Sequence, residues 1–434
     1  AAGQDLQPTA GKLNNLRAAF DQWDADSCAF LIAIVNGQEP VILCHGNDTK
    51  GNPASTQTYT PTASITRLLV ADALHVKMKG RLGVPAGLAI GGKHPTFLEL
   101  LNGTDLVPDY WDWRPGSKPL KREDLLACAD LAADAGFKFG RDRAGMTELL
   151  LMQPLLLSNG IKDWPSFIRV NLSPRASGLD PRDAANLTAA EQSKFSLSST
   201  IAEGAKPSVL RLIATPKELA SWWQWRLQSS MHLWEGFRMG HLGKAKHRDK
   251  VERWRFEDFD DRPVKSLACT YPKSSSGILC ISIGPDKWSP DQAASLQEAF
   301  EADLFGELPQ LRQGLGFGIA APHALVPLDD LVGRQWTTPK GSALKCVIQV
   351  GDETHKGLTL TLGKLTFTSS QTLWRGDNLR AVVSIDNPRG GVAWLHPHPS
   401  RKNPKRLSGV FVERTSISVT PHVLELTLDA KSPR

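Results

Sequence analysis

Two side chains at the start of a helical pattern have types that could do chemistry. Ser64 and Arg67 lie three residues apart, and apolar residues recur at helical spacing from Ile65 onward. Since positions i and i+3 share a helix face, we expect the two side chains on one side. Ser64 could act as a nucleophile, contact a substrate, or simply cap the helix. Arg67 keeps its proton in proteins and cannot act as a base, so it is either a salt-bridged helix residue or a fixed charge for a carboxylate or oxyanion.

A histidine in the second half of the chain is the other candidate for proton transfer. His241 is followed by Gly243 and Lys244 in a segment that we expect to form a strand at the edge of a cleft. Histidine titrates near neutral pH and could act as a general acid or base, although a hydrogen-bonded structural histidine fits the pattern too. Gly243 and Lys244 are expected to contact substrate, and a pairing of Ser64 with His241 requires the fold to bring them together.

Aromatic residues suggest a wall for a ligand. The chain has 13 Trp but only 3 Tyr, and three aromatic residues, Tyr110, Trp111 and Trp113, fall within a few positions in a turn-like segment. There they could stack on a flat or cationic ligand or pack structurally. Trp222, Trp223 and Trp225 share one predicted helix, which indicates core packing instead.

The elements that must position these residues follow from hydrophobic periodicity and capping signals. The Asn36-Gly37 dipeptide between two apolar runs predicts a β-hairpin. Thr215-Pro216-Lys217-Glu218 is a capping box that opens a helix. A first helix, a hairpin, a helical middle, two strands and a closing helix predict an α+β domain in which the first and last helices share one face of a single antiparallel sheet. The other expected helices span residues 13–23, 96–101, 148–157 and 289–304, and the two strands span 267–270 and 278–283.

A change of pattern marks the second domain. A connection rich in Gly, Pro and Leu runs from residue 306 to about 327, and short β-like segments separated by turns follow it. We therefore expect one domain over residues 1–327 and a small β-barrel over residues 328–434.

Composition excludes several classes of protein. Hydrophobic residues make up 41% of the chain and charged residues 22%, which is typical of a globular protein. The net charge of +6 over 434 residues is too dilute to indicate a nucleic-acid partner, and no apolar run is long enough for a transmembrane segment. The six cysteines lack metal-ligand spacing and are expected to be free, mostly buried thiols. We expect a soluble protein with no metal and no cofactor, of undetermined compartment and oligomeric state.

Four stretches in the same order resemble a known family. The segment Thr58 to Arg67 resembles the nucleophile region of serine β-lactamases and penicillin-binding proteins, especially the D-aminopeptidase and class C β-lactamase branch. Phe97 to Trp111, Thr215 to Trp225 and Gly240 to Gly243 are similar to that family's later helices, turn and His-x-Gly motif. The resemblance implies a serine β-lactamase-like fold, and the tail resembles the lipocalin-like barrels appended to D-aminopeptidases.

The chain departs from the family at two catalytic motifs. The family motif is Ser-x-x-Lys, in which lysine helps to deprotonate serine, but Arg67 stands at the lysine position. The family's Tyr-x-Asn or Ser-x-Asn element is expected between Gly140 and Gln153, where no Tyr or Asn occurs. Both departures argue against standard acyl-enzyme hydrolysis.

Three functions remain open. The first is a repurposed enzyme that acts on a small organic or peptide-like molecule in the former hydrolase cleft, through Ser64, Arg67 and His241. The second is a serine hydrolase or acyltransferase, D-aminopeptidase- or esterase-like, that uses Ser64 with a substitute base. The third is a non-catalytic ligand-binding protein on a hydrolase scaffold. The first is our working hypothesis, because positioning and fixed charges can lower a barrier without a covalent intermediate.

Overall fold

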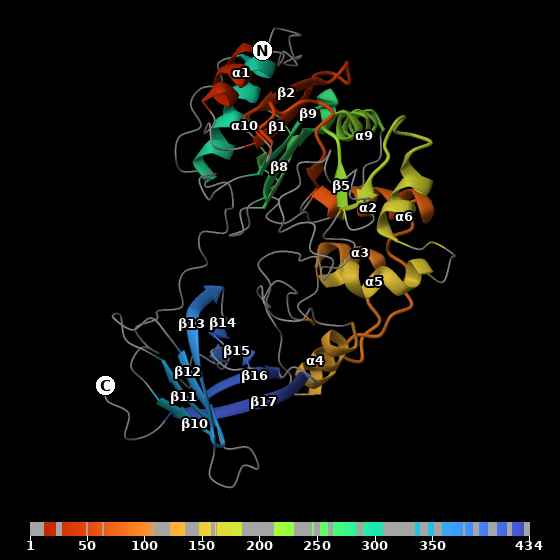
Figure 1. The fold of residues 1–434 in the computed structure, drawn as a ribbon. Coiled ribbons are helices and arrows are strands. Elements are labelled where there is room, and N and C mark those ends of the chain that lie inside the picture. The colour runs from red at the N-terminus through yellow and green to blue at the C-terminus, as the bar shows by residue number, and fades with distance from the viewer. Residues whose placement is uncertain are drawn as a thin grey trace, which may run out of the picture. The chain divides into compact units, whose positions relative to one another are not determined.

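The computed structural model divides into two units, residues 1–84 with 152–318 and residues 85–151 with 319–434 (Figure 1). Within them the structure describes residues 13–22, 28–48, 51–62, 65–103, 106–107, 122–134, 147–157, 161, 163–184, 212–229, 245–246, 252–258, 264–283, 290–306, 335–338, 346–350, 358–375, 378–384, 390–397, 406–414 and 419–428. The boundary expected at residues 327 and 328 lies outside the described residues.

A six-stranded antiparallel sheet is the centre of the first unit. Its strand order is β2-β1-β9-β8-β7-β6. Strands β1 and β2 form the predicted hairpin, and Asn36 and Gly37 adopt positive φ angles of 51° and 66° at its turn. The strands are β1 (Cys28–Ile34), β2 (Val41–His45), β6 (Ala245–Lys246), β7 (Glu252–Asp258), β8 (Val264–Tyr271) and β9 (Ser276–Ile283), with the short helix η5 (Pro272–Ser274) between the last two.

The first and last helices of this unit cover one face of the sheet, as the sequence predicts. Helices α1 (Asn14–Asp21) and α10 (Pro290–Phe305) pack together and form a buried core with alternate residues of β1, β8 and β9. The Asp303 carboxylate accepts hydrogen bonds from the backbone N–H groups of Asn15 (3.2 Å) and Leu16 (2.8 Å). A side chain of α10 thus satisfies backbone donors at the start of α1, where no earlier turn supplies acceptors.

Helix α9 (Pro216–Gln228) packs on the same sheet through β1, β2 and β9. Trp222 and Trp223 are fully buried, which confirms the predicted core role of this part of the helix. The helix approaches β9 so closely that a Cβ on Gly277 would lie 3.2 Å from the Trp223 ring and 2.7 Å from the Cys269 carbonyl oxygen. Glycine is therefore required at position 277 by close packing.

Three short strands and two helices complete the described core of the first unit. The small sheet has the order β3-β5-β4, and α6 contacts α2. The elements are β3 (Thr60–Pro61), β4 (Arg182–Asp183), β5 (Leu212–Ala214), α2 (Ile65–Lys77) and α6 (Trp164–Leu172). Helix α5 (Thr147–Leu157) spans the boundary between the two units.

The second unit contains helices α3 (Phe97–Asn102) and α4 (Arg122–Asp134) and eight antiparallel strands. The strands close in sequential order, with β10 paired to both β11 and β17. They are β10 (Gln335–Thr337), β11 (Cys346–Val350), β12 (Leu358–Leu362), β13 (Leu365–Arg375), β14 (Asn378–Ser384), β15 (Gly390–Pro397), β16 (Arg406–Arg414) and β17 (Val419–Leu428). The whole chain is therefore a mixed α/β protein with antiparallel sheets.

The cysteines agree with the sequence prediction wherever they are described. Cys28, Cys128, Cys269 and Cys280 are buried cysteines outside any disulfide bond, and Cys44, likewise not in a disulfide, is half-buried. Burial raises the pKa of Cys28 to about 12, with smaller contributions from Asp48 and Cys44. At neutral pH such a thiol stays protonated and unreactive.

Candidate active site at the start of helix α2

The small sheet fixes the entry of the chain into α2. Thr60 and Pro61 pair with Ala214 and Ile213 across β3 and β5. The next residue, Thr62, donates from both its backbone N–H (3.0 Å) and its hydroxyl (3.1 Å) to the Leu212 carbonyl oxygen. The backbone at Thr62 is therefore firmly anchored to β5.

The first turn of α2 continues this anchoring. The Ile65 N–H donates to the Thr62 carbonyl oxygen at 2.9 Å, and the hydroxyls of Thr62 and Thr66 are 2.5 Å apart. All residues from Ile65 to Leu74 are buried. A helix that is buried all round its first turns can hold a functional group at its start with little freedom.

Arg67 lies in this buried first turn with only 2% of its surface exposed. The sequence predicts it on the same helix face as position 64, three residues earlier. Arginine is not deprotonated in proteins, so its guanidinium serves only as a hydrogen-bond donor and a positive charge. Arg67 can thus supply a fixed positive charge and directed N–H donors, and it cannot accept a proton from a serine.

The middle of α2 is joined to α9 by a buried ion pair. Asp72 is 0% exposed and Arg226 is 4% exposed, and their carboxylate and guanidinium are in contact. The indole N–H of Trp222 donates to the other carboxylate oxygen of Asp72 at 3.0 Å. The Arg226 guanidinium also lies 5.7 Å from the Trp222 ring centroid. One carboxylate on α2 therefore contacts two residues one turn apart on α9.

Burial and charge act in opposite directions on this pair. Burial raises the pKa of Asp72, while Arg226 and the Trp222 N–H act to lower it. Burial lowers the pKa of Arg226, and Asp72 raises it. Burial also lowers the pKa of the nearby His75, against a smaller upward effect of Asp72. Neutral His75 therefore adds no further positive charge beside Arg226.

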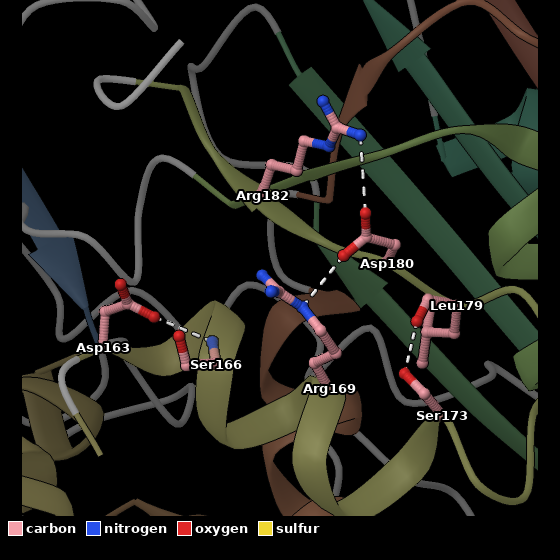
Figure 2. A network of polar contacts seen from close by, with 7 residues as sticks. All are labelled: Asp163, Ser166, Arg169, Ser173, Leu179, Asp180 and Arg182. Atoms are coloured by element: carbon pink, nitrogen blue, oxygen red, sulfur yellow. Dashed lines mark hydrogen bonds and ion pairs between the residues drawn. The ribbon is translucent and has the colours of Figure 1, made fainter. Parts of the chain in front are cut away.

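A second polar network holds α6 and the segment before β4 against this frame (Figure 2). Asp163 caps α6 by accepting a hydrogen bond from the Ser166 N–H at 2.8 Å. Asp180 pairs with Arg169 of α6 at 2.9 Å and with Arg182 of β4 at 3.4 Å. The Arg182 guanidinium also lies 5.5 Å from the centroid of the ring of Tyr59, a residue that Figure 2 does not draw. These contacts connect α6, through β4 and β5, to the strand that leads into α2.

Of the predicted site residues, Arg67 is the one that the structure describes. Ser64, Tyr110, Trp111, Trp113, His241, Gly243 and Lys244 lie outside the described residues. Their roles, and the pairing of Ser64 with His241, remain predictions from the sequence. What the structure adds is the anchored and buried start of the helix on which Arg67 lies.

The sequence analysis missed the Asp72–Arg226 pair. Asp72 stands at i+7 from Ile65, within the apolar stripe that includes Leu68 and Leu69, and Arg226 follows the three tryptophans of α9. A charged residue at such a position must be paired or neutralised when the stripe is buried. This signal marks a buried charge on each helix, but it does not identify the partner.

No group of three or more His, Cys, Asp or Glu side chains in the part of the chain that the structure describes could hold a metal ion. Among the helices within the described ranges, none combines the length and apolar character needed to cross a membrane.

Solved structures share this fold. A β-lactamase/D-alanine carboxypeptidase from Yersinia pestis, complexed with citrate, aligns with 68% of this chain and 99% of its own, at 13% identity and a TM-score of 0.50. A structure of SurE with D-leucine aligns with 95% of this chain and 98% of its own, at 15% identity and a TM-score of 0.50. The octameric penicillin-binding protein homologue from Pyrococcus abyssi aligns with 96% of this chain and 100% of its own, at 13% identity and a TM-score of 0.49.

At these identities the likeness establishes the fold alone, which is that of the β-lactamase/D-alanine carboxypeptidase. The resemblance found in the sequence is thereby confirmed at the level of fold. No protein-family model and no curated protein matches the chain.

Proposed function

We propose that this protein is an enzyme that acts on a small organic or peptide-like molecule in the former hydrolase cleft of a β-lactamase-like fold, without standard acyl-serine hydrolysis. The observation that carries the proposal is Arg67, a buried guanidinium in the first turn of α2 where the family motif has lysine. The fold supports a hydrolase ancestry, and the side chain at this position cannot perform the lysine's proton transfer.

In the proposed mechanism Arg67 supplies charge and geometry. Its planar guanidinium would bind a substrate carboxylate, or stabilise an oxygen on which negative charge develops, by charge-assisted hydrogen bonds. Such donors act most strongly when they are fixed before the reaction, and the anchored first turn of α2 provides this rigidity. Ser64 would contact the substrate, and His241 would transfer protons as general acid or base.

The remaining predicted residues would shape the site. Tyr110, Trp111 and Trp113 would form an aromatic wall, and Gly243 and Lys244 would border the cleft. The similar proteins suggest the class of probe to try, because one is a β-lactamase/D-alanine carboxypeptidase and another was solved with D-leucine. A small molecule with a carboxylate and an amino-acid-like body is therefore the substrate class that we test first.

Two alternatives make different predictions. A serine hydrolase or acyltransferase would form an acyl-enzyme at Ser64 with a substitute base. A ligand-binding protein without activity would bind the probe and leave it unchanged. Because Arg67 cannot act as the base, neither alternative uses it for proton transfer.

Binding of D-leucine and D-alanyl-D-alanine to the full-length protein, measured by isothermal titration calorimetry, tests the role of Arg67. Loss of a charge-assisted hydrogen bond costs roughly 1.5–3 kcal/mol, so Arg67→Ala should weaken binding about tenfold to hundredfold. Arg67→Lys should also weaken it, because the ammonium lacks the planar fork. Arg81→Ala, at an exposed arginine beyond the same helix, is the matched control and should bind as wild type.

Turnover of D-alanyl-D-alanine, followed by release of D-alanine, is measured on the same variants together with their unfolding midpoints. If Arg67→Ala lowers stability but changes neither affinity nor turnover, Arg67 is a structural ion-pair residue and the proposed site is wrong. Release of D-alanine that is lost in Ser64→Ala would instead favour the serine-hydrolase alternative, because the proposal excludes standard acyl-serine hydrolysis.

A further inference from the structure

One helix of the second unit lies against a strand that is distant in the sequence. Helix α4 contacts β17, and both belong to the unit formed by residues 85–151 and 319–434. On α4, Leu125, Cys128 and Ala129 are buried, with at most 1% of each exposed. These residues are at i, i+3 and i+4, so they share one face of the helix. This face is therefore covered by other parts of the protein.

The strand that contacts α4 is also the strand that closes the barrel. β17 pairs with β16 along its whole length and with β10, the first strand of the barrel. Its residues Leu424 and Leu426 are buried, at 0% and 2% exposure. β17 therefore takes part both in the barrel and in the contact with α4.

A loop attaches to the same helix. The Gly91 N–H donates to the Asp130 carboxylate at 3.1 Å, and a Cβ on Gly91 would lie 3.0 Å from the Ala133 Cβ and 3.1 Å from the Ala129 carbonyl oxygen. The loop is closed by hydrogen bonds between Ile90 and Lys93 in both directions. It ends at Thr96, the N-cap of α3. Loop 85–96 therefore packs closely on α4 at Gly91.

We infer that the buried face of α4 is an intramolecular docking surface whose partner is β17, and that α4 and loop 85–96 open and close with the barrel rather than with the six-stranded sheet. Segments that are cooperative in this way exchange their amide hydrogens together. The inference does not depend on the proposed function, since it concerns which parts of the chain share their stability.

Amide hydrogen exchange of the full-length protein, read by mass spectrometry, tests the inference. Leu424→Ala removes packing inside the barrel and should speed exchange in β16, β17 and α4 by a similar factor of about tenfold or more, because such truncations cost several kcal/mol. Exchange in β8 and β9 should stay at the wild-type rate. Phe411→Leu, a milder change at another buried barrel residue, replaces it if Leu424→Ala does not fold.

Two further variants complete the design. Leu267→Ala, in the buried core of the sheet, should speed exchange in β8 and β9 and leave α4 unchanged. Gly91→Ala should speed exchange in loop 85–96 and α4, since its Cβ would crowd the helix backbone. The inference is overturned if the barrel variant leaves α4 at the wild-type rate, if it speeds the sheet equally, or if Leu267→Ala speeds α4 as much as β9.

Discussion

Asp72 and Arg226 illustrate how two buried charges can join two helices. Each loses its hydration when α2 packs on α9, and their attraction and the Trp222 hydrogen bond offset that cost. A buried pair of this kind contributes little net stability compared with apolar residues, but removal of one partner leaves an uncompensated charge. The pair therefore favours one alignment of α2 and α9 over others.

Four variants, Asp72→Ala, Arg226→Met, their double variant and Asp180→Ala, should differ in stability when unfolded by urea. Asp72→Ala should lower the free energy of unfolding by about 3–5 kcal/mol, because Arg226 stays buried without its carboxylate. The double variant Asp72→Ala, Arg226→Met should lose less than the sum of the two single changes, since it buries no charge. Asp180→Ala, which breaks the ion pairs with Arg169 and Arg182 between side chains that are 36% to 47% exposed, is the control and should cost about 0–1 kcal/mol.

Additive effects of the two single changes would show that Asp72 and Arg226 do not depend on each other. A loss in Asp180→Ala as large as that in Asp72→Ala would show that burial does not decide the cost. Either result contradicts the account of the pair.

For single residues, the sequence predicted the chemistry of a side chain better than it predicted the packing around that side chain. The inability of Arg67 to act as a base follows from its side chain alone. Its nearly complete burial depends on the elements packed around the first turn of α2, which the local pattern does not specify. For the same reason the Asp72–Arg226 pair was missed, because its two residues lie 150 positions or more apart.

Two capping boxes with the same geometry show how an element's environment changes the behaviour of its cap. In both, the glutamate carboxylate accepts the threonine N–H at 2.7 Å, and the glutamate N–H donates to the threonine hydroxyl at 3.2 Å. The exposed Glu99 has a lowered pKa, because it accepts the hydrogen bonds from Thr96. Burial raises the pKa of Glu218, against the hydrogen bonds from Thr215.

The opposite pKa shifts predict opposite pH dependences of stability. A lowered pKa stabilises the fold above the ordinary value near 4.5, and this contribution is lost as the pH falls through the folded pKa. A raised pKa gives a contribution that is present below 4.5 and is lost as the pH rises through the folded pKa. Urea unfolding of wild type, Glu99→Gln and Glu218→Gln between pH 3.5 and 7 measures both.

The advantage of wild type over Glu99→Gln should shrink on acidification, whereas its advantage over Glu218→Gln should grow. Comparison of each variant with wild type at the same pH removes the effect of all other titrating groups. If the stability advantage of wild type over both variants changed in the same direction with pH, the result would contradict the assigned causes, which are hydrogen bonding for the pKa of Glu99 and burial for the pKa of Glu218.

The sequence was most informative about individual helices, strands and turns. The hairpin turn at Asn36-Gly37 and the capping box at Thr215 use residues whose local chemistry specifies the structure, and both were predicted correctly. Strand β10 was missed because it has three residues, too few for a periodic pattern. Helix α4 was not recognised either, since its apolar residues give only a weak stripe.

For the whole molecule, the element order predicted the sheet covered by its first and last helices. Sequence alone did not predict that α4 and loop 85–96 share a unit with the barrel strands. That association is set by tertiary contacts between distant segments, and no local pattern encodes them. The sequence resemblance indicated the fold, but it left the reaction open because the catalytic motifs differ at Arg67 and in the Tyr-x-Asn region.

A β-lactamase-like fold that carries Arg67 in place of lysine should not form the standard acyl-serine intermediate. Incubation of the full-length protein with a fluorescent penicillin, read by gel fluorescence and intact mass, tests it most directly. An active penicillin-binding protein serves as the positive control, and Ser64→Ala and Arg67→Lys are treated in parallel. We predict that wild type and Ser64→Ala stay unlabelled, and any labelling gained in Arg67→Lys would agree with loss of the base. Stoichiometric labelling of wild type that disappears in Ser64→Ala would contradict the claim and identify a serine hydrolase with a substitute base.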